Sequence, residues 1–131
     1  MQKVDITNSG VWKHLVELPE GSAGFRMRGS LPTDENGAVL MIEHWNKGMI
    51  ETPHFHPGDD MTIVMAGIMA VQPHILVDGQ WQHDGEEQVY HVGETAYLKA
   101  TQVHSVRYLE DTKLVYIHDG EFDLTEVELN L

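Results

Sequence analysis

Short apolar and β-branched stretches alternate with turn residues along this chain. Glycine, proline, asparagine and aspartate recur at short intervals, as in Pro57-Gly58 and Asp78-Gly79. No window of helical length shows a 3.6-residue apolar period with caps. Segments rich in β-branched and aromatic residues are predicted as strands: Ala38–Trp45, Met61–Met65, Ile68–Gln72, Ile75–Val77, Val103–Leu109 and Lys113–His118. The pattern therefore predicts an all-β chain, and Asp78-Gly79 predicts a hairpin turn.

Many short strands must protect their edges, and a sandwich or a closed barrel does so economically. The chain has 131 residues, which predicts a single domain over residues 1–131. The acidic stretch from Glu121 to Leu131 alternates weakly and is expected to add an edge strand, within this chain or across a dimer. On the strand that begins near Asp60, a period of two predicts an inward face and an outward face. Asp60 inside would bring Thr62, Val64 and Ala66 inside, with Met61, Ile63 and Met65 behind them.

Charge and cysteine content narrow the functional classes. Eight Lys and Arg stand against 21 Asp and Glu, a net charge of −13 that would repel nucleic acid and anionic membranes. No cysteine is present, so any metal must be held by nitrogen and oxygen donors. The first residues contain no apolar stretch of signal-peptide length, and a cytoplasmic location is the default expectation.

The segment from Gly48 to Gly67 contains a pair of histidines with metal-ligand spacing. His54 and His56 are two residues apart, so on a strand their side chains face the same side. Asp60 follows a Pro-Gly turn and can return an oxygen donor to that face. Such a pair alone is a weak signal, because surface and core pairs have the same spacing.

A second segment, from Gly93 to Tyr108, supplies a third histidine, and here the chain resembles the cupin superfamily. The first cupin motif (Gly, five residues, His-x-His, three or four residues, Glu, six residues, Gly) is matched by Gly48, His54, His56, Asp60 and Gly67. The second motif is matched at Gly93 and His104, with Lys99, Thr101 and Tyr108 where Pro, Gly and Asn are usual. The resemblance covers roughly residues 38–118.

The resemblance implies a cupin-type double-stranded β-helix, a jelly-roll barrel of two antiparallel sheets. It also implies one divalent transition metal per chain, held by His54, His56, Asp60 and His104. Asp60 is one methylene shorter than the usual Glu, so direct ligation, ligation through water and no ligation all stay open. Fe(II) is favoured, and Mn, Ni, Zn and Cu suit the same donors.

Other residues are candidates for chemistry or for the pocket wall. Tyr108 has the same strand parity as His104, while His44 and His118 are expected near the barrel mouth, and these three are the catalytic candidates. Thr62, Trp45, Met41 and Tyr97 are candidate pocket residues, although each also fits a plain core position. Arg26 and Arg28 alternate with Phe25 and Met27, and an inward arginine face would clamp a substrate carboxylate.

The preferred function is a small metal-dependent enzyme that acts on an organic carbonyl or carboxylate metabolite. With Fe(II), dioxygenase-like C–C cleavage or oxygen insertion is favoured. With another metal, a lyase or isomerase that uses a tyrosine, a histidine or Glu43 as its base is the alternative. A non-catalytic small-molecule binding or sensing module is the third hypothesis, since the fold alone does not determine function. A homodimer is expected, because cupins commonly pair through a sheet face or exchanged terminal strands.

Overall fold

The computed structural model describes residues 15–17, 25–30, 38–119 and 123–129, and the side chains of residues 40–118 and 123–129. The described elements are all strands: β1 (Leu15–Glu17), β2 (Phe25–Ser30), β3 (Ala38–Trp45), β4 (Ile50–Phe55), β5 (Asp60–Ala66), β6 (Met69–Val77), β7 (Gln80–His83), β8 (Gln88–Tyr90), β9 (Thr95–Leu98), β10 (His104–Tyr108), β11 (Thr112–Asp119) and β12 (Thr125–Glu126). None of the described residues forms a helix with the length and apolarity needed to span a bilayer.

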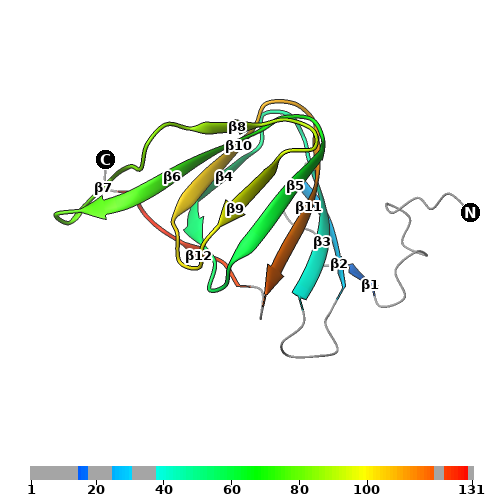
Figure 1. Cartoon of the computed structure of the whole chain (residues 1–131), viewed down its shortest axis with the longest axis horizontal. Helices are drawn as coiled ribbons and strands as arrows, with labels where there is room; N and C mark the ends of the chain where they lie inside the picture. Colours follow the sequence, from blue (N-terminus) through cyan, green and yellow to red (C-terminus); the bar gives the residue numbers. More distant parts are fainter. Residues whose placement is uncertain (1–14, 18–24, 31–37, 120–122, 130–131) are drawn as a thin grey trace, which may run out of the picture.

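The strands form two antiparallel sheets (Figure 1). One sheet has the order β1-β2-β3-β11-β5-β9, and the other has the order β12-β4-β10-β6-β7, with β8 also paired to β6. A core cluster that includes Met41, Val64, Met69 and Leu114 draws on strands of both sheets. The predicted all-β jelly-roll barrel is therefore confirmed.

The period-two pattern on β5 follows the prediction for most of its length. Asp60, Thr62 and Val64 are buried, while Met61 is exposed. The prediction for Ala66 was wrong, because this residue is exposed. The pairing of β5 with β11 shifts after Val64, so the alternation does not continue to the end of the strand.

β6 is one strand where the sequence predicted two. Pro73 lies between the two predicted segments and has no N–H to donate to a neighbouring strand. The strand can continue through Pro73 because the pairing partner of β6 changes there. β10 pairs with β6 up to Pro73, and β7 pairs with β6 from His74 onwards. The β6–β7 hairpin turns at Asp78 and Gly79, which both have positive φ, as expected for the predicted two-residue turn.

The C-terminal segment adds an edge strand within the same chain, one of the two predicted outcomes. β12 pairs with β4, with Thr125 opposite Phe55 and Glu126 opposite His54. The segment therefore lies along the strand that carries the first histidine of the motif.

Candidate metal centre

A β-bulge in β4 determines which of its side chains face the barrel interior. β10 pairs with β4 so that His104 is opposite His54 and Val106 is opposite Glu51. Two steps along β10 thus correspond to three steps along β4, and the extra residue lies at Thr52-Pro53. In a regular strand, Glu51 and His54 would face opposite sides, whereas here both line the internal cavity.

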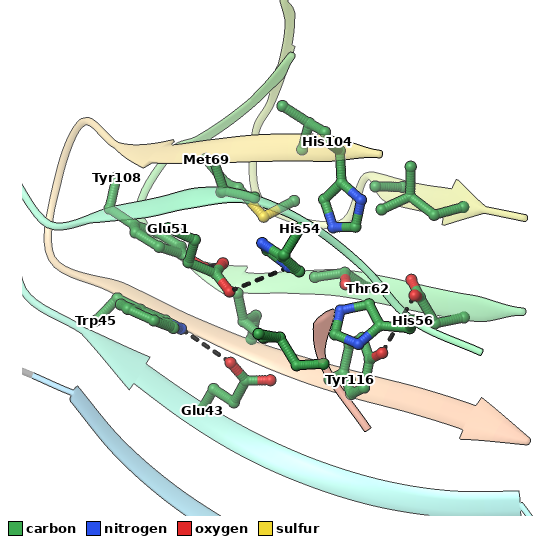
Figure 2. Close-up of a pocket in the computed structure, with 17 residues that line it drawn as sticks. Glu43, Trp45, Glu51, His54, His56, Thr62, Met69, His104, Tyr108 and Tyr116 are labelled. Carbon is green, nitrogen blue, oxygen red and sulfur yellow. Dashed lines mark hydrogen bonds and ion pairs between the residues drawn. The ribbon is translucent and has the colours of Figure 1, made fainter. Parts of the chain in front are cut away.

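His54, His56 and His104 converge inside this cavity. One nitrogen from each ring lies within 4.8 Å of the other two. The centroids of the His54 and His104 rings are 4.4 Å apart, and those of His54 and His56 are 4.9 Å apart. All three side chains are at most 9% exposed. The structure therefore brings together the three histidines that the motifs pointed to (Figure 2).

Hydrogen bonds to main-chain carbonyls fix how the three imidazoles are turned. The Nδ1 atoms donate to Thr52 O at 2.6 Å, Asp123 O at 2.7 Å and Gln102 O at 2.9 Å, for His54, His56 and His104 respectively. Since a carbonyl oxygen only accepts, each Nδ1 carries a proton, and in the neutral form of each ring Nε2 is then the atom with the lone pair. Metal-binding histidines are usually held in this way.

Burial also keeps two of the rings neutral. Burial, reinforced by the neighbouring His54, lowers the pKa of His104 to about 3. Burial is also the main cause that lowers the pKa of His56. Three imidazoles whose Nε2 atoms converge fit a divalent transition metal and leave further coordination positions open.

Asp60 lies in the cavity wall but outside the three-histidine cluster. It is 3% exposed, and its Oδ2 accepts a hydrogen bond of 3.1 Å from the Tyr116 hydroxyl. Its Oδ1 is buried without a hydrogen-bond partner among the described residues. Burial raises the pKa of Asp60 to about 7, although the Tyr116 hydrogen bond lowers it. Direct ligation by Asp60 stays a prediction.

Two further carboxylates, Glu43 and Glu51, line the cavity beside an aromatic pair. Trp45 Nε1 donates to Glu43 Oε1 at 2.9 Å, and the Tyr108 hydroxyl donates to Glu51 Oε2 at 2.5 Å. The Trp45 and Tyr108 rings are stacked with their centroids 4.5 Å apart. Glu51 Oε1 also lies 3.9 Å from His54 Nε2, on the side where a metal would bind (Figure 2).

Burial is the largest cause that raises the pKa values of both carboxyl groups. The pKa of Glu43 rises to about 8, with a further contribution from the nearby Glu51. The pKa of Glu51 is also raised by burial, against the opposing effects of His54 and of the Tyr108 hydroxyl. The same environment raises the pKa of Tyr108 well above its ordinary value.

The cavity has a volume of about 240 Å³. Its lining residues are Glu43, Trp45, Glu51, His54, His56, Asp60, Thr62, Met69, Val71, Ala96, Leu98, His104, Val106, Tyr108, Leu114, Tyr116 and Leu124. No lysine or arginine occurs among these lining residues, all of which belong to the described part of the chain. The cavity thus combines an apolar wall with three carboxylates and three imidazoles.

The other predicted site residues divide into two groups. Trp45, Thr62 and Tyr108 line the cavity. Four do not, although each is in the described part of the chain: Met41, His44, Tyr97 and His118. Tyr97 is 56% exposed and donates to Asp59 Oδ2 at 2.8 Å. His118 is buried on β11, with its ring centroid 5.5 Å from that of Tyr116.

The predicted arginine clamp lies on β2, whose backbone is described and whose side chains are outside the described set. The register pairs Arg26 with His44 and Arg28 with Ile42. Neither partner lines the cavity. The clamp and the three catalytic candidates stay predictions.

Sequence reasoning missed Glu51 and Tyr116. The proline in Glu51-Thr-Pro-His54 could have signalled a bulge, because proline interrupts the hydrogen-bond ladder of a strand. Tyr116 is opposite Thr62, just as His118 is opposite Asp60 on the paired strand β5. Strand pairing, which the sequence did not reveal, would have placed Tyr116 on the inward face.

Comparisons with known proteins identify the class of fold. No family model and no curated protein sequence matches the chain. Among solved structures, KdgF from Halomonas sp. is similar with a TM-score of 0.64 and 17% identity, over 79% of this chain and 86% of KdgF. A variant of oxalate decarboxylase from Bacillus subtilis is similar with a TM-score of 0.69 and 18% identity, over 85% of this chain and 30% of that protein.

A cupin superfamily protein from Desulfitobacterium hafniense is also similar, with a TM-score of 0.60 and 10% identity over 79% of this chain and 84% of its own. The fold and the site together define a small β-barrel protein with a three-histidine cluster inside the barrel. The barrel is that of the cupins, so the chain has the cupin fold, as the motif resemblance predicted.

Proposed function

We propose that this protein is a metal-dependent enzyme that binds one divalent transition metal through the Nε2 atoms of His54, His56 and His104. The observation that carries the proposal is the fixed orientation of the three rings, whose Nδ1 atoms are all bonded to main-chain carbonyls. When bound, such a metal supplies a Lewis acid for a carbonyl or carboxylate oxygen of the substrate.

The lining of the cavity supports a small substrate that brings hydrogen-bond donors. About 240 Å³ is smaller than most drug-sized pockets. Glu43 accepts a hydrogen bond from Trp45, and Glu51 accepts one from Tyr108. The remaining lone pairs of both carboxyl groups can accept hydrogen bonds from a ligand. No described lysine or arginine lines the cavity to pair with a substrate carboxylate, so an anionic group of the substrate would need the metal.

Proton-transfer chemistry, as in a lyase or isomerase, is the reaction class that these contacts support best. Glu51 lies 3.9 Å from the metal-facing nitrogen of His54 and is held by the Tyr108 hydroxyl. A carboxylate at this place is positioned to take a proton from a substrate bound beside the three histidines. Protonated Glu51 can then return the proton to another atom of the substrate, while the Tyr108 hydroxyl keeps its own proton and holds the carboxyl group in place.

Dioxygenase chemistry with Fe(II) is the second candidate. A three-histidine cluster that no described carboxylate joins leaves several coordination positions open. Apolar residues such as Met69, Val71 and Leu98 form much of the remaining wall, which suits an organic substrate and dioxygen.

Metal analysis after anaerobic purification tests the common part of the proposal. We expect about one transition metal per chain in the wild type and its loss in His104→Ala. Wild-type protein that takes up none of Fe(II), Mn(II), Ni(II), Cu(II) or Zn(II) would overturn the proposal.

Two assays then separate the reaction classes. β-Diketones, hydroxylated aryl ketones and small hydroxy-carbonyl compounds are incubated with the loaded enzyme in D₂O. Solvent deuterium in the product or recovered substrate, without oxygen uptake, supports proton transfer. Substrate-dependent oxygen uptake with Fe(II) supports the dioxygenase.

Glu51→Gln is the matched variant, because it keeps the three histidines and is expected to abolish only the deuterium exchange. Tight ligand binding with neither activity would support the non-catalytic module.

A further inference from the structure

The C-terminal segment Asp123–Leu129 is attached to the strand that carries the first ligand. Thr125 and Glu126 pair with Phe55 and His54 of β4. The main-chain N–H of Val127 donates to Pro53 O at 2.9 Å. This short edge strand therefore lies beside the part of β4 that carries His54, and Figure 1 shows β12 next to β4.

The same segment supplies the hydrogen-bond partner of one histidine. His54 and His104 donate from Nδ1 to carbonyls two residues earlier in their own segments, at Thr52 and Gln102. His56 donates instead to the main-chain oxygen of Asp123, which is 67 residues away along the chain. Of the three imidazoles, His56 is thus the one whose orientation depends on a distant segment.

Leu124 extends this arrangement to the cavity wall. Its side chain lines the cavity and is 40% exposed, so it lies between the cavity and solvent. The main-chain N–H of Leu124 donates to the carboxylate of Asp123 at 2.8 Å, which fixes the chain locally where the Asp123 carbonyl faces His56.

We propose that segment 123–129 stabilises the metal centre, because its Asp123 main-chain carbonyl positions His56 for metal binding. Docking of the segment and binding of the metal then strengthen each other, because coupling between two binding events is reciprocal. This inference rests on the proposed metal site and adds a residue that no cupin motif contains. Loss of a ligand's outer hydrogen bond commonly weakens metal binding about 10- to 100-fold, so undocking the segment should weaken binding by a similar factor.

Val127→Pro tests the proposal within the full-length chain. Proline removes the N–H that donates to Pro53, and the preceding Glu126 is already in the extended conformation that proline favours. Val127→Ala is the matched control, since it shortens the side chain and keeps the N–H. Zinc(II) affinity is measured by competition with a chelating dye, and the spectrum of Co(II)-loaded protein reports the geometry at the metal.

We expect zinc affinity to fall about 10-fold or more in Val127→Pro, with a changed Co(II) spectrum, and to stay within about 3-fold of wild type in Val127→Ala. The thermal midpoint of the metal-free proteins shows whether each variant is folded. Wild-type affinity and spectrum in a folded Val127→Pro protein whose segment amides have lost protection would overturn the proposal.

Amide hydrogen exchange of the wild type provides a test that needs no variant. Zinc(II) should slow exchange at Val127 and its neighbours as well as in β4 and β10. Protection confined to β4 and β10 would contradict the coupling while leaving the metal site intact. Absence of zinc binding by the wild type would instead refute the proposed function, so the two failures are distinguishable.

Discussion

Replacing Glu43 by glutamine should make the metal-free protein more stable at high pH. Glu43 is 8% exposed, and burial together with the nearby Glu51 raises the pKa of its carboxyl group to about 8 from an ordinary 4.5. Between these two values the folded protein holds a proton that the unfolded chain releases. The free energy of unfolding of the wild type therefore falls as the pH rises through this range and levels off above about 8.

The magnitude follows from the size of the pKa change. Each pKa unit corresponds to about 1.4 kcal/mol, so the penalty for ionised Glu43 has an upper bound of roughly 5 kcal/mol. The carboxylates Glu43 and Glu51 titrate together, which shares the penalty between them, and a gain of about 2–5 kcal/mol at pH 9 is expected. Glutamine keeps an oxygen acceptor for Trp45 Nε1, so the variant should match the wild type near pH 5.

Urea unfolding followed by tryptophan fluorescence, with EDTA present and at intervals from pH 5 to pH 9, measures this difference. Glu86→Gln, at an exposed position, is the control for the general effect of removing one negative charge. A difference between Glu43→Gln and wild type that stays constant from pH 5 to pH 9 would refute the reasoning. So would a variant that is less stable than wild type at pH 9.

Three further predictions concern the ligands, the Tyr108 hydroxyl and a motif glycine. His54→Ala should weaken zinc(II) binding more than about 100-fold, beyond the effect of losing an outer hydrogen bond, and unchanged metal content would contradict the ligand assignment. Tyr108→Phe removes the hydrogen bond to Glu51 and should lower the free energy of unfolding by about 1.5–3 kcal/mol in urea, whereas a loss below about 0.5 kcal/mol would show that the bond contributes little. Gly67→Ala should cost roughly 3 kcal/mol or more, because φ is +86° and a Cβ would collide with the main-chain oxygen of Asp111. Gly48→Ala, with φ of +87° and nothing within 4 Å of the added Cβ, should cost only about 1–2 kcal/mol, and equal losses for the two glycines would contradict the steric argument.

The sequence predicted the fold and the three histidines because both depend on spacing. His54 and His56 share a face by strand parity, and His104 lies at the position that the second motif specifies. Turn residues such as Asp78-Gly79 fixed the hairpin for a local steric reason. Each of these signals lies within a short stretch of the sequence, which is why the sequence alone could predict the fold.

The rest of the site depends on pairing between distant strands, which local patterns do not encode. The bulge at Thr52-Pro53 reverses the parity on which a prediction for Glu51 would rest. Tyr116 reaches Asp60 because β11 pairs with β5, and Asp123 reaches His56 from the end of the chain. The cytoplasmic location and the homodimer stay predictions.

The bulge in β4 also has a consequence for how this protein can diverge. Because of the extra residue, one short strand carries both a proposed metal ligand, His54, and a cavity carboxylate, Glu51, three positions before it. Substitution at position 51 would therefore alter the charge presented to a substrate while leaving the three histidines in place. With the proposed metal site, a single-codon change at position 51 would therefore be expected to change the acid–base chemistry of the cavity without removing a metal ligand.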